Sequence, residues 1–486
     1  MNYRFVFKRL GFILLIEAFL LLFPLCVALY YNENVMPFVY TILSLIICGG
    51  ALSLIKAKRT SYYAKEGLII TALSWVLLSV FGALPFIIDG VIPSYIDALF
   101  ETVSGFTTTG SSILTNVEAM SKSLLFWRSF THWIGGMGIL VFVIALLPLS
   151  NDNSMHVIKA ETPGPFPGKL LPKLSDTAKW LYGIYSFLTI LEIIFLCLGG
   201  MPLFDSVLTS FGTAGTGGFG IKNNSIAFYN SAYIDYVVGI FMILFGINFN
   251  VFFLIIMRKF KQALFNEELR AYLIIVIVSV LLISFNILSI SQNYFEALRL
   301  SFFQVSTIIT TTGYSTTDFN LWPTFSKIIL FILMLFGACG GSTGGGIKIS
   351  RIIIIFKKLT NDFVSLIHPK SIRTVKLDNK TVEDKIVHEI AYFFILYFFI
   401  IGLITLLVSL DNFDFETTLS SVVACISNIG PGFGLVGPVG NFSMFSSLSK
   451  LLLSLAMLLG RLELYPILLF LSPSIFIQKK KLEKKK

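Results

Sequence analysis

Apolar runs close to 20 residues long alternate along this chain with short polar stretches. A helix needs about 20 residues to cross the hydrocarbon core of a bilayer, which is roughly 30 Å thick. The pattern therefore predicts about ten transmembrane helices. They are expected at residues 11–31, 36–56, 67–88, 127–149, 180–200, 232–257, 270–290, 325–356, 386–409 and 447–477.

A second pattern occurs four times between these runs: an acidic residue, a stretch of apolar and small residues, and a short loop with a glycine. Internal repetition of this kind predicts one structural unit repeated four times. The loops read TTTGSS from Thr107, GTGGFG from Gly215, TTTGYS from Thr310 and NIGPGFG from Asn428. The preceding acids are Asp97, Asp205, Glu296 and Glu416, and small residues stand six positions before each loop glycine, at Ser104, Gly212, Thr307 and Ala424.

These patterns predict an all-α polytopic membrane protein. Four pseudo-symmetric repeats of helix, re-entrant pore loop and helix would surround a central pore, after an N-terminal helix pair. The pair is expected at residues 1–62, and the repeats at 63–150, 151–262, 263–378 and 379–486.

Composition supports a membrane protein. Hydrophobic residues make up 55% of the chain and charged residues 13%, and the mean hydropathy is +0.83, which excludes a water-soluble globule of this length. Lysine and arginine gather in alternate connections and in the tail, as in cytoplasmic loops. We therefore expect both termini in the cytoplasm and the four loops entering from outside. The net charge of +10 follows from this topology and requires no nucleic-acid partner.

Four glycine-bearing loops at membrane depth indicate ion conduction. Irregular backbone inside a bilayer persists only where protein buries it or water lines it. Carbonyl oxygens of such loops can replace the hydration shell of a cation, and the glycines at 110, 218, 313 and 430 permit the required conformations. A half-helix entering from outside also directs its negative end towards the membrane centre. The four acids could concentrate cations at the mouth, but helix capping is the favoured interpretation.

A second glycine-rich stretch, residues 337–348, interrupts the helix after the third loop. It is not a phosphate-binding loop, because Ile347 separates Gly346 from Lys348 and no strand precedes it. Its position below the third loop favours a movable gate over a simple helix kink. The gate is expected to comprise Gly340, Gly341, Ser342, Thr343, Gly344, Gly345, Gly346 and Arg461.

Arg461 lies in the last apolar run, where a buried charge is costly enough to suggest a function. Its candidate partners are the carbonyls and hydroxyls of residues 340–346, or Glu463. Glu463 follows two positions later and so points to another helix face. A purely structural arginine that ties helices together is the alternative.

Catalysis is not indicated. The histidines at 132, 156, 368 and 388 have no nucleophile or metal-ligand spacing around them, and the five cysteines suggest neither disulfides nor a metal site. A membrane-embedded enzyme or receptor would need convergent polar residues within the helices, and these are scarce.

Several motifs resemble the Trk/Ktr/HKT superfamily of potassium transporters, most closely its bacterial TrkH/TrkG type. The motifs include SGFTTTGSS from Ser104, HWIGGMGI from His132, AETPGP from Ala160, CGGSTGGGIK from Cys339 and GRLELYP from Gly460. The resemblance implies a potassium uptake subunit of the bacterial inner membrane. A sodium-permeable or sodium- or proton-coupled transporter of the same superfamily is the alternative.

The resemblance also implies a binding site and partners. Potassium is the transported ion, and no cofactor is expected on this chain. A homodimer with one pore per subunit is implied, together with a cytosolic TrkA-like regulatory subunit that binds nucleotides. The basic stretch 357–385 and the tail 479–486 could dock that subunit or contact anionic lipid. The implied potassium-binding residues are Thr108, Thr109, Gly110, Thr216, Gly217, Gly218, Thr311, Thr312, Gly313, Asn428, Ile429 and Gly430.

Overall fold

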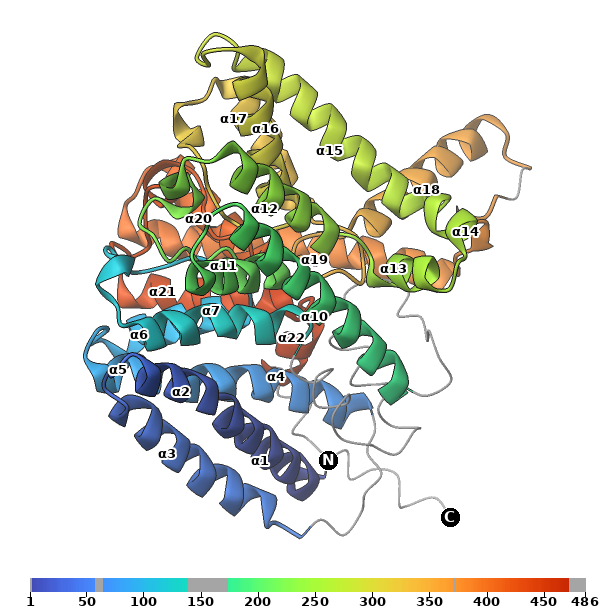
Figure 1. Ribbon diagram of the computed structural model, residues 1–486. Helices are drawn as coiled ribbons and strands as arrows, with labels where there is room; N and C mark the ends of the chain where they lie inside the picture. Colours follow the sequence, from blue (N-terminus) through green and yellow to red (C-terminus); the bar gives the residue numbers. More distant parts are fainter. Residues whose placement is uncertain (1, 57–63, 139–173, 371–372, 472–486) are drawn as a thin grey trace, which may run out of the picture.

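The computed structural model describes residues 2–56, 64–138, 174–370 and 373–471 (Figure 1). Six helices in these ranges are long and apolar enough to cross a membrane. A seventh span is counted if the bent pair α12 (Ala232–Phe245) and α13 (Phe249–Ile256) is taken as one. An all-helical membrane protein is thus confirmed, with one small exception: a hairpin of β1 (Lys376–Leu377) and β2 (Lys380–Thr381) follows α18 (Ile349–Ile367).

Several sequence predictions fall outside the described residues. These are the domain junctions at 62–63 and 150–151, the end of the 127–149 segment, the AETPGP motif from Ala160 and the basic tail 479–486.

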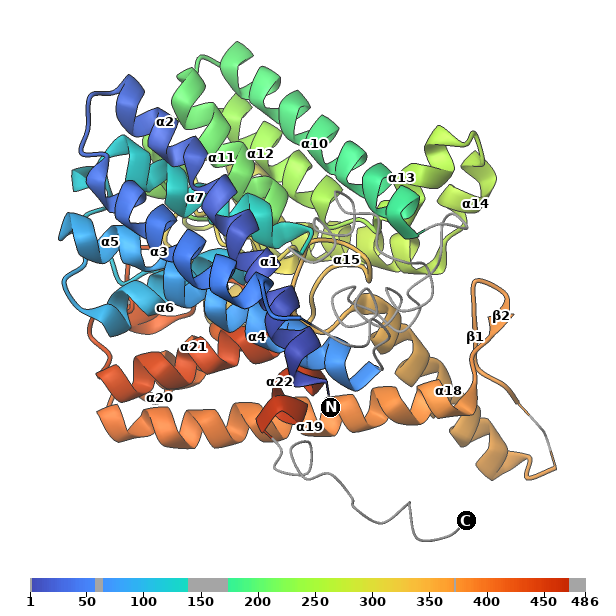
Figure 2. The same ribbon diagram turned by 90° about the horizontal axis from the view of Figure 1, so that it is seen from below.

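The N-terminal helices lie at one edge of the molecule, beside α4 (Ala64–Gly82) (Figure 1, Figure 2). α1 (Tyr3–Leu20) continues into α2 (Leu22–Tyr30), and this span packs along α3 (Met36–Ser53). A β-carbon on Gly11 would lie 2.7 Å from the carbonyl oxygen of Gly49. Small residues at this crossing therefore allow the two backbones to approach closely.

The rest of the bundle repeats one order of elements: a long first helix, a short half-helix ending in a glycine loop, and a second helix. The first repeat consists of α4, its extension α5 (Leu84–Asp89), α6 (Tyr95–Phe106) and α7 (Lys122–Gly136). The second consists of α10 (Leu174–Leu198), α11 (Leu203–Gly215) and α12. The third consists of α15 (Glu267–Asn286), α16 (Tyr294–Ile309) and α17 (Thr324–Leu335), and the fourth of α19 (Asp384–Val408), α20 (Phe415–Ile426) and α21 (Ser447–Arg461). The connecting and terminal helices are α13, α14 (Phe260–Leu264), α18 and α22 (Tyr465–Leu471).

Three of the four half-helices begin at a side-chain cap. Ser94, Asn293 and Asp414 each accept a hydrogen bond from the backbone N–H three residues later. The acids that the sequence favoured as caps lie instead within the first turn, two or three residues after the cap position. Of these, Glu296 accepts a backbone N–H, from Gln292 at 2.7 Å. The capping prediction is therefore wrong for Asp97, Asp205 and Glu416, whose side chains bind Lys450, Tyr229 and Lys327.

The second helices are short. They have 12 to 15 residues, so each is roughly 18–22 Å long and does not cross the hydrocarbon core alone. The predicted segment 127–149 begins earlier, at Lys122, and its helix ends at Gly136.

Two predicted segments are wrong as continuous helices. Segment 232–257 bends by 90° between α12 and α13, where the Asn248 side chain caps the new helix. Segment 447–477 breaks after Arg461, where Glu463 and Leu464 adopt left-handed φ values of 53° and 69°. Hydropathy averaged over 20 residues does not detect such breaks, because both flanks are apolar.

Candidate functional site

The four glycine loops, which carry Gly110, Gly218, Gly313 and Gly430, have the same backbone conformation. In each loop the glycine has a positive φ, between 70° and 102°. The residue two positions earlier is also left-handed, which is uncommon for a non-glycine residue. These residues are Thr108, Thr216, Thr311 and Asn428, with φ values of 55°, 54°, 59° and 56°.

The same hydrogen bond fastens each glycine loop to its own half-helix. The backbone N–H of the residue before the glycine donates to the carbonyl oxygen of the small residue six positions before the glycine. The nitrogen–oxygen distances are 2.8 Å in the first three loops and 2.9 Å in the fourth. The register that sequence analysis assigned at Ser104, Gly212, Thr307 and Ala424 is thus a structural equivalence.

Contacts between the loops close a ring. A β-carbon on Gly110 would overlap the Gly217 carbonyl oxygen of the second loop. One on Gly218 would overlap the Thr312 carbonyl of the third, and one on Gly313 the Ile429 carbonyl of the fourth. On Gly430 it would lie 2.9 Å from the Thr109 carbonyl oxygen of the first. Each glycine therefore faces the carbonyl of the next loop, in the order one, two, three, four.

A hollow of about 240 Å³ opens at this ring. All four loop glycines line it, so the loops surround one common opening. Arg128 and Lys222 also reach it.

Polar side chains link neighbouring loops. The Asn428 amide donates to the Thr109 hydroxyl at 2.9 Å and to the Met457 carbonyl at 3.0 Å. In the first and third loops, paired threonine hydroxyls lie 2.8 Å apart, Thr107 with Thr109 and Thr310 with Thr312. The amide of Asn428 thus joins the fourth loop to the first, where the fourth loop departs from the Thr-Thr-Gly pattern.

The 337–348 stretch lies against the third and fourth loops where the half-helices α16 and α20 end. The Gly345 N–H donates to the Thr311 hydroxyl at 2.7 Å. A β-carbon on Gly345 would overlap the Ser427 carbonyl, and one on Gly344 would lie 3.1 Å from the Thr310 carbonyl. The stretch therefore sits directly beneath the ring, between α17 and α18.

The first half of this stretch is fastened to the bend between α12 and α13. The Cys339 N–H donates to the Gly246 carbonyl at 3.1 Å, and the Phe249 N–H donates to the Gly341 carbonyl at 3.0 Å. Glu268, buried at the start of α15, accepts from the N–H groups of Gly340 at 2.7 Å and Ser350 at 3.0 Å. Sequence analysis missed Glu268, although an acid beside an apolar run was a usable signal.

The second half depends on two cationic side chains. The Lys348 ammonium donates to the carbonyls of Gly344 and Gly345. Arg461, at the C-terminal end of α21, donates to the Thr343 carbonyl at 2.8 Å. Of the partners considered for Arg461, the structure therefore has a loop carbonyl, while Glu463 pairs with Arg351 at 2.6 Å.

Arg461 also reaches the first repeat. Its guanidinium donates to the carbonyls of Gly135 at 2.5 Å and Gly136 at 2.7 Å, at the end of α7. The helix dipole places partial negative charge on these terminal carbonyls. One side chain thus connects the ends of two second helices to the 337–348 stretch.

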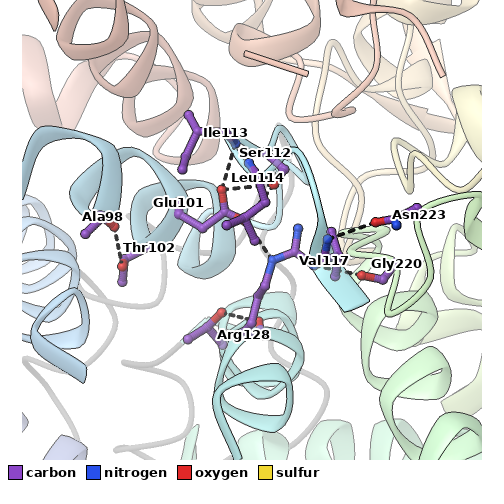
Figure 3. A network of polar contacts seen from close by, with 11 residues as sticks. Ala98, Glu101, Thr102, Ser112, Ile113, Leu114, Val117, Arg128, Gly220 and Asn223 are labelled. Atoms are coloured by element: carbon purple, nitrogen blue, oxygen red, sulfur yellow. Dashed lines mark hydrogen bonds and ion pairs between the residues drawn. The ribbon is translucent and has the colours of Figure 1, made fainter. Parts of the chain in front are cut away.

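A buried ion pair beside the segments that follow Gly110 and Gly218 was not predicted. Figure 3 shows Glu101 of α6 and Arg128 of α7 pointing towards one another, with Nε and Oε1 2.6 Å apart. The signal for it in the sequence is weak, since it consists of single charged residues within mostly apolar stretches. In the part of the chain that the structure describes, no cluster of His, Cys, Asp and Glu could hold a metal ion.

Comparisons with known proteins agree with this geometry. The family model of the TrkH cation transport protein matches residues 34–480. The Trk system potassium uptake protein TrkG of Escherichia coli K12 is 36% identical over 475 residues, covering 96% of this chain and 98% of TrkG. The corresponding TrkH of Salmonella typhimurium is 32% identical over 485 residues, covering 98% of this chain and all of that protein.

A solved structure agrees as well. The crystal structure of the potassium transporter TrkH from Vibrio parahaemolyticus superposes with a TM-score of 0.88 at 30% identity, covering 98% of this chain and all of that chain. Because these relatives are potassium transporters, the matches identify the protein as a transporter rather than an enzyme. By sequence and by fold, the chain belongs to the TrkH family of cation transport proteins.

Proposed function

We propose that this protein takes up potassium across the bacterial cytoplasmic membrane through the ring of four glycine loops. The observation that carries the proposal is the cyclic contact of each loop glycine with the carbonyl of the next loop. Carbonyl oxygens gathered around one opening can replace a cation's hydration shell. The names of the relatives, potassium uptake proteins, support potassium as that cation.

The filter consists of three consecutive residues from each loop. Their backbone carbonyls would hold the ion, so the change to Asn428 and Ile429 in the fourth loop alters the side chains and leaves the carbonyls in place. The twelve residues are Thr108, Thr109, Gly110, Thr216, Gly217, Gly218, Thr311, Thr312, Gly313, Asn428, Ile429 and Gly430.

Rubidium or potassium uptake in a bacterial strain that lacks its own uptake systems tests this proposal. The wild-type chain should restore uptake at low external potassium and favour potassium over sodium. Gly110→Ser, Gly218→Ser and Gly313→Ser should abolish both, because each added side chain meets a carbonyl oxygen of the neighbouring loop. Equal flux of sodium and potassium through the wild type would instead favour a sodium-permeable transporter.

The gate consists of residues 340–346 together with Arg461. Its position beneath the third and fourth loops and its bonds to Arg461 support this role. Deleting Gly340 to Gly346 should raise basal uptake, since the segment would no longer cover the inner end of the ring. Unchanged uptake in a folded deletion variant would leave the segment as a packing element.

Membrane topology and assembly complete the proposed transporter. The chain would span the membrane about ten times, in the N-terminal pair and four repeats delimited above, with both termini in the cytoplasm. It would form a homodimer and be controlled by a cytosolic nucleotide-binding subunit of TrkA type. Purified protein in liposomes tests the pore and its regulation separately. Potassium flux without any partner would support the pore, and a change in flux on adding the regulatory subunit with nucleotide would support regulation by that subunit.

A further inference from the structure

The Glu101–Arg128 ion pair spans the outer ends of the first and second glycine loops. The Arg128 guanidinium donates from Nε to Glu101 at 2.6 Å and from Nη1 to the Gly220 carbonyl at 2.9 Å. Glu101 in turn accepts from the Ser112 hydroxyl at 2.9 Å and the Ile113 N–H at 3.0 Å (Figure 3). Two charges therefore connect the segments that follow Gly110 and Gly218.

Arg128 also holds the second loop through an aromatic ring. Its guanidinium carbon lies 3.5 Å from the centre of the Phe219 ring, and the imidazole of His132 stacks on the same ring at 4.1 Å. Both groups cannot lie this close on one side, so Phe219 is held between them. Arg128 and His132 are four residues apart on α7 and therefore share a helix face.

The same helix face supports the backbone of the second loop. A β-carbon on Gly217 would overlap the His132 ring. The ring thus occupies the space that a side chain would fill at Gly217. One face of α7 accordingly contacts Gly217, Phe219 and Gly220 of the second loop.

The other repeats lack these charges. The second helices can be aligned by counting from their first residues. At the seventh residue, α7 has Arg128, whereas α12, α17 and α21 have Val238, Leu330 and Leu453. At the eleventh residue, α7 has His132, whereas the other three helices have methionine, at Met242, Met334 and Met457. All eight side chains are buried. Nine residues before each loop glycine stand Glu101, Thr209, Gln304 and Ser421, which are also buried.

Local contacts support this alignment for α7 and α21. A β-carbon on Gly135 of α7 would overlap the Phe106 carbonyl, four residues before Gly110. One on Gly460, the equivalent position of α21, would overlap the Ile426 carbonyl, four residues before Gly430. The backbone contact at the end of α7 therefore matches that of the fourth repeat, which lacks the charged pair.

Neutral groups connect the other neighbouring loops. The Tyr314 hydroxyl donates to the Thr209 carbonyl at 3.0 Å, and the Asn320 amide donates to the Gly434 carbonyl at 3.2 Å. The Phe442 N–H donates to the Ser112 carbonyl at 2.8 Å. Charged pairs join other repeats too, as Lys450 and Asp97 do, but the Asp97 carboxylate is partly exposed, whereas both members of the Glu101–Arg128 pair are buried. Because a buried ion pair seldom stabilises a fold more than apolar packing does, stability alone does not account for the Glu101–Arg128 pair.

We propose that Glu101 and Arg128 are positioning residues that determine ion specificity. They fix the spacing of the first two loops at the outer end of the ring, where Gly110 faces the Gly217 carbonyl. A planar guanidinium bound at two edges and stacked on a ring permits little lateral movement. This inference rests on the proposed potassium filter.

The third repeat supplies the test variant. It holds Gln304 and Leu330 at the positions of Glu101 and Arg128, so the double variant Glu101→Gln/Arg128→Leu installs in the first repeat a pair that the fold already accommodates. Each single variant leaves one buried charge without its partner and should lower the yield of folded protein. Val238→Leu, a change of apolar side chain at the equivalent position of α12, is the matched control.

The measurement is potassium and sodium uptake in proteoliposomes, with KM and maximal rate for each ion, and a thermal unfolding curve for every variant. The folded double variant should lose about tenfold in potassium over sodium discrimination, which corresponds to roughly 1.4 kcal/mol. Val238→Leu should keep the wild-type ratio. A purely structural role would lower the yield and the unfolding temperature without changing the ratio.

Arg128→Lys provides a second test if the double variant does not fold. Lysine keeps the charge beside Glu101 but has no planar group to stack on Phe219 and bind Gly220. The ratio should then fall in the same direction, by less. Wild-type discrimination in a folded double or lysine variant would overturn the inference, whereas a wild-type chain that transports no potassium would overturn the proposed function instead.

Discussion

At the scale of single residues, each glycine loop is defined by two residues with left-handed backbone, the loop glycine and the residue two positions before it. A non-glycine residue in this region costs about 1–2 kcal/mol, so the conformation persists only where its surroundings enforce it. In each loop, the first left-handed residue is threonine or asparagine, which is strained by this conformation. The second, two positions later, is glycine, which is not. Glycine is required at the second position for two reasons: it adopts the positive φ without strain, and it leaves room for the carbonyl oxygen of the neighbouring loop.

The four glycines are not equally sensitive, and this yields a first prediction. A β-carbon on Gly110, Gly218 or Gly313 would overlap a carbonyl, but on Gly430 it would lie 2.9 Å from the nearest one. Gly430→Ala should therefore retain more potassium uptake and more discrimination against sodium than Gly110→Ala, Gly218→Ala or Gly313→Ala. Initial uptake rates at matched expression measure the difference.

The comparison is decisive in both directions. The φ of Gly430 is 102°, so alanine still pays a backbone cost there, and uptake should stay below wild type. If Gly430→Ala is as inactive as Gly313→Ala, the carbonyl contact does not set the sensitivity and the positive φ alone does.

Half-helices are the elements that place the glycine loops. Three of the four begin at a side-chain cap, and each ends where its loop begins, so the negative end of the helix dipole is directed towards the ring. The Asp414 cap of α20 shows the pattern well: its carboxylate accepts from the Thr417 N–H at 2.9 Å.

A second prediction concerns this cap. Hydrogen bonds from the hydroxyl and the N–H of Thr417 hold the pKa of Asp414 below its ordinary value. The stabilisation is thus present above that ordinary pKa and is lost as the pH falls through the lowered one. Asp414→Ala should cost about 1 kcal/mol at neutral pH. The difference from wild type in thermal unfolding should shrink in acid.

Glu416→Gln is the control for Asp414→Ala. Glu416 lies in the first turn of the same helix, and its nearest cation is Lys327 at 3.4 Å. Removing its charge without removing a cap should change stability much less. Equal losses in the two variants would assign the effect to charge near the helix terminus rather than to capping.

The sequence predicted these elements unevenly, for physical reasons. The register of the glycine loops was accessible because positive φ and close backbone contact restrict residue choice locally. The ends of α12 and α21 were not, since hydropathy is the same on both sides of the break. The Glu101–Arg128 pair and the role of Glu268 depend on residues far apart in the chain, and no local pattern indicates which acid meets which donor.

Across the whole molecule, the 337–348 stretch is held by two repeats besides its own, and Arg461 links it to the remaining one. The second repeat fastens its first half through the bend between α12 and α13. Arg461 of the fourth repeat holds its second half and reaches the end of α7 in the first. Gly341 and Gly346, with φ values of 71° and 63°, flank the part that depends on side chains. If residues 342–346 moved as the proposed gate, their bonds to Lys348, Arg461 and Thr311 would break, and the bonds of Cys339 and Gly341 to the bend between α12 and α13 could stay in place.

A final prediction follows for Arg461. Arg461→Gln removes the charge that binds the carbonyls of Thr343, Gly135 and Gly136, so basal potassium flux without any regulatory partner should rise several-fold. Arg461→Lys keeps the positive charge but lacks the planar guanidinium that binds the Thr343 carbonyl and the α7 carbonyls together, so flux should rise less than in Arg461→Gln. Arg299→Gln is the control, because Arg299 pairs with Asp235 at 3.7 Å, away from the 337–348 stretch. Flux into proteoliposomes, compared at equal amounts of folded protein, gives the result. Wild-type basal flux in folded Arg461→Gln would mean that the arginine ties the helices together without restraining a gate.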